Sequence, residues 1–484
     1  MDPATDNRPS GCPCDPASVV PSVATKAIED QEWYHGFRPL SDLSRLITKP
    51  GEFLVRATMS GLETIYMITV MMCNKVVAHV PLRKDSDGCW FVPPGEYCKY
   101  FDRVAFSTIT DLINYYRIHP FSAHLKCEKI IYRPPWWVKS VDIAYVDAKD
   151  RLGTSGQFYK GTWKRKDGET TVVIKKPIMS TADATDEEKD KANASSIALM
   201  KEARHIKSFK DHNVVQCVGV AYDCLPIMLL TEFCAGGSLL RHLTTYGKDT
   251  DVKEKIMYIY EAALGLSFLK HARCVVRNVC TLNCFISTAG RIKIGNFVHT
   301  TKKYDLEDGI PDASLLNYIK RNARYCAPEA FGAPIALQFS FKSDCWSFGM
   351  IVYEVFSNGV KPWPEINEDT THVECNVVAS MIRKGEMPTL PEGTPSKLMD
   401  LVGSIWKINP EQRLAMAEIA LQLHAVVKEI CKGPDFAHEP MTVNKIPGVH
   451  RESFFELADT FELEPSSGPS TDVAEGKRIL STGK

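Results

Sequence analysis

The pattern of apolar and polar positions changes repeatedly along the chain and predicts both helices and strands. Helical spacing of apolar residues occurs in two early stretches, 40–47 and 106–116. Short, apolar and β-branched runs at 51–58 and 65–73 predict strands instead. The early part of the chain should therefore fold as a small module in which a few strands lie between two helices.

A longer succession of strand-like and helical patterns begins near Val146 and ends near Cys431. The run 171–175 reads as a strand, 198–220 as a helix followed by a strand, and 226–243 as a buried strand that leads into a hinge. We expect a second, larger domain over this length. The predicted fold class is therefore α+β with more than one domain.

Segments rich in proline, serine and small polar residues flank and separate these two domains. Such composition favours disordered chain, and the consecutive prolines of RPPWWV favour an extended linker. An acidic, aromatic stretch near the C-terminus, 453–465, reads as a flexible docking segment. The expected organisation is a disordered tail at 1–28, a first domain at 29–133, a linker at 134–145, a second domain at 146–431 and a flexible tail at 432–484.

The composition is that of a globular protein, and it excludes several classes of function. A formal net charge of -1 in 484 residues gives no bulk attraction to nucleic acid or to an anionic membrane. The 16 cysteines are scattered, and Cys12 and Cys14 lack the second pair that a zinc site needs. There is no secretory leader and no apolar run long enough for a transmembrane helix, and Asp2 stands where an acylated glycine would be. We therefore expect a reduced, cytoplasmic protein.

The sequence FLVR at 53–56 places an arginine at the end of an apolar strand. Arginine is rarely buried without a partner, so an inward-pointing Arg56 should meet an anion, and its planar fork suits a phosphate dianion. A structural salt bridge, or an exposed strand end, is the simpler interpretation of these four residues alone. The motif EWYHG at 32–36 and the helix at 106–116 favour the anion.

Taken together, these three motifs resemble an SH2 domain, the phosphotyrosine-binding module, over about 100 residues. The resemblance implies that Arg56 binds the phosphate and that Thr58 adds a hydroxyl donor two residues later. It also implies that His79 lies below the phosphotyrosine ring, with a possible shift of one residue in the alignment of this strand.

One position departs from the SH2 pattern. Four residues beyond the glycine of WYHG, many members of the family carry a second arginine, and this chain has Leu40. The phosphate pocket should therefore have one cation fewer, unless Arg38 or Arg45 replaces it.

The larger domain opens with a cluster of glycines, among them Gly153 and Gly156, whose backbone N–H groups suit a phosphate. A glycine cluster alone is equally an ordinary loop. The motifs that follow favour the phosphate because they keep one order and spacing. They are a strand ending in Lys175, a helix that carries Glu202, and then RNVCTLN, GNF, APEA, DCWSFG and PEQR.

This order of motifs resembles a protein kinase domain over about 280 residues, and TEF, APEA and SNGVKPWP make it similar to the tyrosine kinases. With an SH2 module directly ahead, the chain is similar to the Fes/Fer class of cytoplasmic tyrosine kinases. The resemblance implies a bilobal fold and an ion pair between Lys175 and Glu202, with Lys176 as the alternative in register. The residues that it implies for nucleotide binding are Gly153, Gly156, Lys175, Glu202, Thr231, Glu232 and Cys234.

The groups that move protons and hold metal in this family are replaced here. Asn278, next to Arg277, stands where a carboxylate should accept the substrate proton, and a neutral amide is not a base near pH 7. Asn296 replaces the aspartate that binds Mg²⁺, so Asn283 is the one expected metal ligand of the usual type that remains. The histidine of the catalytic loop is Val276.

Residues that hold the fold persist in the same domain. Glu329 and Arg413 match the ion pair that kinases bury in their C-terminal lobe, and Asp344 and Trp346 stand at their positions on a core helix. The substitutions therefore affect the residues expected to move protons and bind metal, and not the residues that hold the fold.

The segment from Asn296 to Glu329 contains three tyrosines, Tyr304, Tyr318 and Tyr325. In active relatives a tyrosine of this segment is phosphorylated and orders the loop for catalysis. With no base and no metal site to serve, we expect Tyr304→Phe and Tyr318→Phe to leave phosphotransfer at background.

Two interpretations of the chain remain. The first is a phosphotyrosine-binding signalling protein whose kinase-like domain is impaired, acts as a scaffold or as an allosteric partner of an active kinase, and binds ATP weakly with little dependence on Mg²⁺. The alternative is an active non-receptor tyrosine kinase. Losing a general base costs on the order of 10²–10⁴-fold in rate, and losing a metal ligand costs more, so Asn278 and Asn296 favour the first. Phosphotyrosine proteins would be its partners, and they would recruit it to sites near membranes.

Overall fold

The computed structural model describes most of the chain between residues 27 and 451. The described residues are 27–43, 45–60, 63–93, 104–121, 125–146, 149–153, 155–181, 183–302, 317, 319–331, 339–366, 371–430 and 441–451. The predicted disordered tail up to residue 26, the docking stretch 453–465 and the tyrosines Tyr304 and Tyr318 lie outside these ranges.

The described residues fall into two compact units. The first contains the described residues up to Ala203 together with Val218–Leu230, and the second contains Arg204–Cys217 and the described chain from Thr231 onward. The N-terminal module and most of the first sheet of the larger domain belong to the first unit. None of the helices in the described ranges is long and apolar enough to span a membrane.

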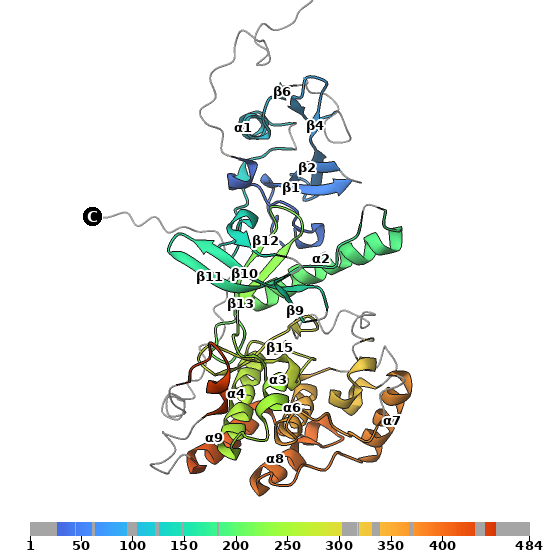
Figure 1. The fold of residues 1–484 in the computed structure, drawn as a ribbon. Helices are drawn as coiled ribbons and strands as arrows, with labels where there is room; N and C mark the ends of the chain where they lie inside the picture. Colours follow the sequence, from blue (N-terminus) through green and yellow to red (C-terminus); the bar gives the residue numbers. More distant parts are fainter. Residues whose placement is uncertain are drawn as a thin grey trace, which may run out of the picture. The chain divides into compact units, whose positions relative to one another are not determined.

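A four-stranded sheet forms the centre of the N-terminal module (Figure 1). Its strand order is β3–β2–β1–β7, and the neighbours are antiparallel except for the pair β1–β7. A smaller sheet joins β4, β5 and β6. The elements are η1 (Ile28–Asp30), η2 (Leu40–Asp42), β1 (Glu52–Ser60), β2 (Glu63–Met71), β3 (Val77–Pro81), β4 (Arg83–Lys84), β5 (Trp90–Phe91), β6 (Ala105–Phe106), α1 (Ile109–Ile118) and β7 (Lys129–Ile130).

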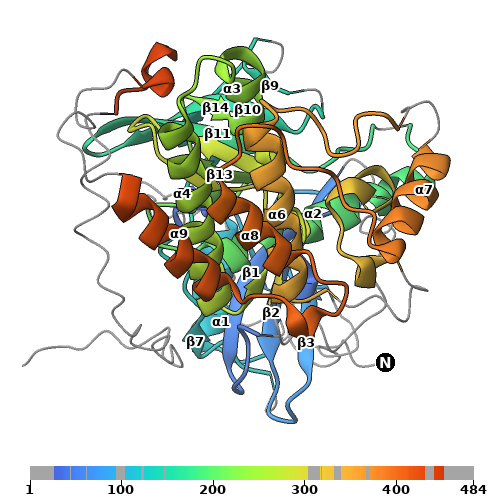
Figure 2. The ribbon, with the colours of Figure 1, turned by 90° about the horizontal axis from the view of Figure 1, so that it is seen from below.

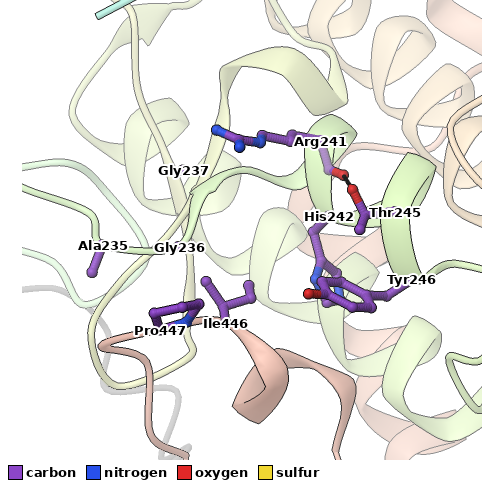
Figure 3. A pocket seen from close by; sticks show the side chains of 9 residues that line it. All are labelled: Ala235, Gly236, Gly237, Arg241, His242, Thr245, Tyr246, Ile446 and Pro447. Carbon is purple, nitrogen blue, oxygen red and sulfur yellow. Dashed lines mark hydrogen bonds between the residues drawn. The ribbon is translucent and has the colours of Figure 1, made fainter.

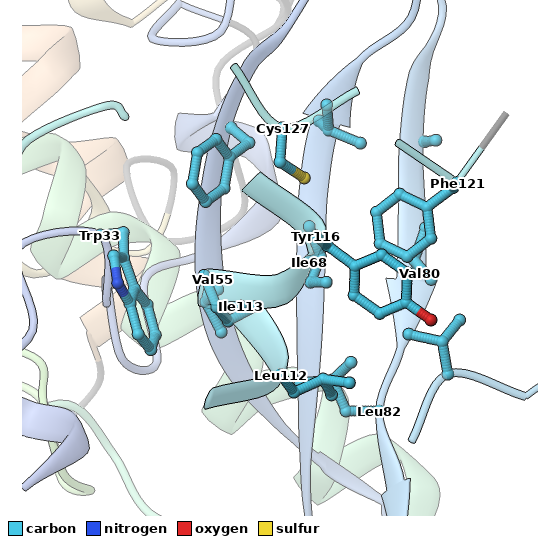
Figure 4. Packing of buried hydrophobic residues seen from close by; sticks show 14 of the residues in the cluster. Trp33, Val55, Ile68, Val80, Leu82, Leu112, Ile113, Tyr116, Phe121 and Cys127 are labelled. Carbon is cyan, nitrogen blue, oxygen red and sulfur yellow. The ribbon is translucent and has the colours of Figure 1, made fainter. Parts of the chain in front are cut away.

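The two faces of the larger sheet bury different side chains, because successive residues of a strand point to opposite sides. One face, which includes Val55, packs against Leu112 and Ile113 of α1 in a fully buried cluster (Figure 4). The opposite face carries Leu54 and, two residues later, Arg56. The predicted anion-binding residue therefore lies on the side of the sheet away from α1.

The two helices predicted for this module differ in the structure. The second forms as α1, and Thr108 caps its N-terminus by accepting a hydrogen bond from a backbone amide of the first turn. In the described residues the first appears only as the short 3-10 helix η2, followed by turns. Pro39 and Pro50 bound this stretch and leave little length for regular helix.

The larger domain begins with a second sheet, in the order β12–β13–β11–β10–β8, with β9 paired to β10. The β-branched run at 171–175 forms the end of β11, as its pattern predicts. The long helix α2 carries Glu202 (Figure 1). The elements are η3 (Ser140–Asp142), β8 (Ile143–Ala144), β9 (Arg151–Leu152), β10 (Phe158–Arg165), β11 (Gly168–Lys175), α2 (Asp186–Ile206), β12 (Cys217–Ala221) and β13 (Met228–Glu232).

Residues 134–145, the predicted linker, are built into this sheet. The backbone N–H of Val138 donates to the carbonyl of Val220 at 3.0 Å, and the N–H of Val220 donates to the carbonyl of Trp136 at 3.0 Å. These bonds form a parallel bridge to β12, and a few residues later β8 pairs with β10. The linker is therefore ordered because it supplies backbone partners to two strands.

Helices dominate the second unit, with α4 and α6 at its centre. Most residues of both helices are buried, and α9 runs alongside α4 (Figures 1 and 2). The helices are α3 (Leu239–Tyr246), α4 (Val252–His271), η4 (Thr281–Asn283), η6 (Ala323–Tyr325), η7 (Pro328–Ala330), α6 (Phe341–Phe356), α7 (Thr371–Lys384), α8 (Ser396–Ile405), η9 (Pro410–Gln412), α9 (Met416–Ile430) and η11 (Thr442–Lys445). The strands are β14 (Gly237–Ser238), β15 (Cys274–Val275), β16 (Cys284–Ile286), β17 (Ile292–Ile294) and β18 (Thr301–Lys302).

A segment beyond α9 also packs on the second unit. Residues Met441–Arg451, named the C-terminal strap here, begin with the helix η11 and bury Val443 and Arg451. The expectation of a flexible tail from residue 432 does not hold for the strap, because buried hydrogen bonds to α4 fix it.

Candidate functional site

Arg56 lies on β1 with its side chain buried, and 8% of the residue is exposed. Its Nη2 is 3.2 Å from the sulfur of Met67, a weak acceptor on the facing strand β2. Its Nε has no hydrogen-bond partner among the described residues. Burial alone lowers the pKa of the guanidinium, and no carboxylate of the described chain offsets that burial. The arginine is thus a buried cation with vacant donors.

Thr58 and His79 share the sheet face of Arg56. Thr58 follows Arg56 by two residues on β1, and His79 of β3 stands opposite Thr69 of β2, which is two residues beyond Met67. The Oγ1 of Thr69 and the Nδ1 of His79 are 3.1 Å apart. Burial and the charge of Arg56 lower the pKa of His79, so it is neutral at pH 7. Sequence reasoning missed Thr69, although its place two residues from Met67 puts it on this face.

The arginine that Leu40 replaces is not restored by Arg38. Leu40 is exposed, whereas Arg38 is buried and donates from Nε to the buried carboxylate of Asp42. The guanidinium of Arg38 also lies 5.7 Å from the ring centre of Tyr222. Its charge is therefore neutralised inside the protein, and Arg45, which is exposed, is the remaining candidate.

Lys175 and Glu202 form an ion pair in the first unit. The Nζ of Lys175 is 2.5 Å from Oε2 of Glu202, and both side chains are buried. The neighbouring Lys176 has a different role, because its Nζ lies over the rings of Tyr145 and Tyr159. Lys175, and not the neighbouring Lys176, therefore makes the ion pair with Glu202.

The predicted glycine loop connects β9 to β10. Gly153 and Gly156 have φ values of +68° and +70°, a backbone region that glycine adopts without strain. Apart from the adjacent residues of the loop, no atom of the described chain lies within 4 Å of a Cβ built on either glycine, so both face open space. Arg151, which replaces the first glycine of the family pattern, is the first residue of β9.

The predicted hinge residues lie at the end of β13 and just beyond it, in the second unit. Thr231 and Glu232 end that strand, and the Oε1 of Glu232 accepts from the Nζ of Lys293 at 2.9 Å and from the backbone of Gln216. Cys234 is buried, and burial raises the pKa of its thiol to about 12. The thiol is therefore protonated at neutral pH and is not a nucleophile.

The backbone of the predicted catalytic loop is held in place by Asp344. The carboxylate of Asp344 accepts from the backbone N–H groups of Val276 at 2.8 Å and Arg277 at 2.9 Å. Arg277 adopts a φ of +64°, and these two bonds fix that conformation. Asn278 follows directly and is buried. Burial raises the pKa of Asp344 to about 6, so the carboxylate that holds this loop becomes protonated at a higher pH than an ordinary aspartate.

The two residues at the predicted metal positions, Asn283 and Asn296, bond to each other. The Nδ2 of Asn296 donates to Oδ1 of Asn283 at 2.8 Å. The Nδ2 of Asn283 donates in turn to the carbonyl of Asn278 at 3.1 Å and approaches the sulfur of Cys280 at 3.2 Å. Asn296 holds a φ of +58°, which asparagine tolerates better than most residues. This chain of amides is the amide latch.

The amide latch does not fit a divalent cation. Mg²⁺ takes oxygen ligands in a tight octahedron and favours carboxylates. Here the oxygen of Asn283 already accepts a hydrogen bond, and Asn296 turns an N–H₂ group toward it. A cation between the two side chains would have to break this bond and rotate an amide, and would gain no charge neutralisation from either residue.

The scaffold residues of the second unit make the contacts that their motifs predict. Arg413 meets Glu329 with two nitrogens, at 2.7 and 2.8 Å, as a bidentate pair in which the arginine is buried and the carboxylate is partly exposed. Trp346 is fully buried. Tyr325, one of the three tyrosines of the activation segment, donates to the buried Glu354 at 2.6 Å. Tyr325 is therefore partly buried against the core, with its hydroxyl engaged by Glu354.

Two family models match the chain. The model of the SH2 domain matches residues 33–116, and the model described as protein tyrosine and serine/threonine kinase matches residues 148–423. The second match covers more than half of the chain.

Several curated proteins are similar to the chain over both domains. Fer-related kinase 1 of Caenorhabditis elegans is 29% identical over 407 residues, which cover 82% of this chain and 94% of that protein. Tyrosine-protein kinase Fer of Homo sapiens is 24% identical over 84% of this chain, which spans only 45% of that longer protein. Spermatocyte protein spe-8 of Caenorhabditis briggsae is 26% identical over 69% of this chain and 60% of its own length.

Proposed function

Because the chain belongs to the protein tyrosine and serine/threonine kinase family and carries an SH2 domain, we propose that it is a phosphotyrosine-directed signalling protein whose kinase-like domain transfers phosphate poorly or not at all. The observation that supports this most directly is the amide latch between Asn283 and Asn296. The domain would then act as a scaffold or as an allosteric partner of an active kinase.

The binding activity rests on Arg56. Desolvating a guanidinium without an internal carboxylate is unfavourable, and a phosphate monoester would supply the missing charge and acceptors. Thr58 and the neutral His79 lie on the same face and would contact the phosphate and the tyrosine ring. SH2 domains bind phosphotyrosine proteins in general. Such partners would bring the chain from the cytoplasm to phosphotyrosine sites near membranes.

Calorimetry with a phosphotyrosine peptide tests this part of the proposal. Arg56→Ala should weaken binding by about 2–5 kcal/mol, because it removes a charge-assisted, bidentate contact. Arg117→Ala removes an exposed arginine of α1, which packs on the sheet face opposite to Arg56, and is the matched control, with an expected loss below about 1 kcal/mol. Equal affinities of the wild type and the Arg56→Ala variant would show that the phosphate binds elsewhere.

The loss of phosphotransfer rests on two missing functions. Asn278 cannot accept the proton of a substrate hydroxyl, and the amide latch supplies no anionic ligand for Mg²⁺. Kinases of this family use ATP and Mg²⁺ in general, and charge neutralisation by the metal provides most of their catalysis. The pair Lys175–Glu202 and the open glycine loop remain for a nucleotide. We therefore expect weak ATP binding that depends little on Mg²⁺.

The second candidate function, an active tyrosine kinase, is favoured by the same retained pair and by the ordered catalytic loop on Asp344. A phosphotransfer assay on the purified full chain separates the two candidates. The wild type should stay at background, and the double variant Asn278→Asp/Asn296→Asp should gain activity if the fold is otherwise competent. A clear Mg²⁺-dependent wild-type rate would overturn the proposal.

A further inference from the structure

The C-terminal strap lies outside both family matches, since the kinase match ends at residue 423. Its composition, rich in polar residues with two prolines nearby, is that of a loop. Both ends of the strap are nevertheless buried, with Thr442 and Val443 at one end and Arg451 at the other. Each end is bound by one buried carboxylate of helix α4.

Glu254 of α4 anchors the first end. Its Oε2 accepts from the backbone N–H of Thr442 at 2.8 Å and from the hydroxyl of the same residue at 3.0 Å. Its Oε1 accepts from the N–H of Val443 at 3.0 Å and from the hydroxyl of Tyr258 at 2.6 Å. Four donors thus satisfy one carboxylate that is 2% exposed. Two of these donors are the backbone N–H groups at the start of η11, which have no partner within the helix itself.

Glu261, two helical turns further along α4, anchors the second end. Nη2 of Arg451 is 2.8 Å from Oε1 of Glu261, and Nη1 of Arg451 reaches Oε2 at 3.3 Å. The side chains are 3% and 0% exposed. The same Nη1 donates to the carbonyl of Gly290 at 3.1 Å. Positions seven apart lie on one face of a helix, so the strap runs along a single side of α4.

The middle of the strap is less closely packed than its ends. Ile446 and Pro447 face Arg241 and Tyr246 of α3 across a cavity of about 340 Å³ (Figure 3). Lys445 makes an exposed ion pair with Asp249, and its Nζ lies 5.7 Å from the ring centre of Tyr246. The buried polar contacts of the strap are therefore gathered at its two anchors, with Val449 as a buried apolar side chain between them.

The second anchor is connected to the amide latch through a strand. Besides Arg451, Glu261 accepts a hydrogen bond from the backbone N–H of Ile292 at 2.9 Å. Ile292 is the first residue of β17, and Asn296 follows it by four residues. In addition, the N–H of His450 donates to the carbonyl of Thr288 at 2.8 Å. The strap thus contacts both sides of the turn between β16 and β17.

We propose that the C-terminal strap positions the hairpin β16–β17, with Arg451 as the positioning residue, and thereby holds Asn296, which follows β17, in place. Without Arg451, the backbone N–H of Ile292 would be the one hydrogen-bond donor, among the described residues, left to the buried carboxylate of Glu261. It would draw in water or move outward, and Ile292 would lose its fixed acceptor. This role does not depend on whether the domain transfers phosphate.

Hydrogen exchange of the full chain, read by mass spectrometry, tests the proposal. In Arg451→Met, peptides that span 288–297 should exchange at least tenfold faster than in the wild type. The control is Leu398→Ala, which removes a fully buried side chain of α8 and leaves a cavity far in sequence from the strap. Compared at temperatures equally far below their own midpoints, the control should keep the wild-type exchange of 288–297 within twofold.

Arg451→Lys is a second, more conservative variant, which keeps the test available if Arg451→Met does not fold. Lysine keeps the charge next to Glu261, but it cannot bond two carboxylate oxygens in a fork and reach Gly290 as well. We expect exchange of 288–297 about threefold faster than in the wild type, and a smaller effect than in Arg451→Met. Unchanged exchange in either Arg451 variant, or the same acceleration in Leu398→Ala, would overturn the positioning role.

Discussion

His242 should make the folded C-terminal strap sensitive to acid. The side chain is 2% exposed, and its Nε2 lies 2.9 Å from the hydroxyl of Tyr258 and 3.2 Å from the hydroxyl of Thr442. Since Tyr258 already donates to Glu254, its oxygen accepts from His242, which places the imidazole proton on Nε2. The Nδ1 atom is buried and has no partner among the described residues, so a second proton would have no acceptor there.

Burial therefore lowers the pKa of His242 from 6.5 to about 4, with the positive charge of Lys445 adding to the effect and the carboxylate of Glu254 opposing it. Because the pKa falls on folding, the stability that neutral His242 contributes is complete above pH 6.5. It is lost as the pH falls toward 4. Linkage between these two values gives a loss of about 2 kcal/mol at pH 5 compared with pH 7.5.

Urea unfolding of the full chain at several pH values measures this loss. His242→Gln is the reference variant, since glutamine keeps an N–H donor for Tyr258 and Thr442 but does not titrate. The transition that Leu398→Ala shifts identifies the second unit. Between pH 7.5 and 5, this transition should weaken by about 2 kcal/mol more in the wild type than in His242→Gln. Parallel pH profiles would refute the assignment of a buried, neutral imidazole.

Three further substitutions have clear expected outcomes. Tyr325→Phe should destabilise the second unit by about 1.5–3 kcal/mol in urea unfolding, because it removes a charge-assisted bond to the buried Glu354, and detection of phosphorylated Tyr325 in folded protein would contradict this. Arg413→Met should cost about 3–5 kcal/mol in the same assay by leaving Glu329 unpaired, and Glu329→Gln/Arg413→Met should cost less than the sum of the single changes. Asn296→Asp should gain a Mg²⁺-dependent rise in melting temperature that the wild type lacks; no gain would mean that the latch is not what keeps the cation out.

The features that sequence patterns predicted most reliably were ion pairs between residues of strictly spaced motifs. Lys175 pairs with Glu202, and Arg413 pairs with Glu329, in the structure. In each case the motifs offer one long basic side chain and one carboxylate as its partner. The stretch 40–47 was less predictable. Its helical spacing buries Leu43 and Ile47 as expected, but the chain reaches that burial with turns.

Contacts between residues of unremarkable type could not be predicted. The sequence shows that Asn283 and Asn296 lack charge, but only the fold brings one amide against the other. The strap was missed for a different reason. Its partners, Glu254 and Glu261, lie 188 and 190 residues away from Thr442 and Arg451, and no local period or motif marks a polar segment that docks through backbone N–H groups.

The pairing of the predicted linker with β12 has a consequence for any shortened form of the protein. β12 is the outermost strand of its sheet, and Trp136 and Val138 saturate the N–H and carbonyl of Val220 on that side. A fragment that starts at the kinase match, residue 148, would leave this edge bare. Unprotected edges recruit strands from neighbouring molecules. Such a fragment should self-associate, whereas one that begins ahead of Trp136 should stay monomeric at the same concentration.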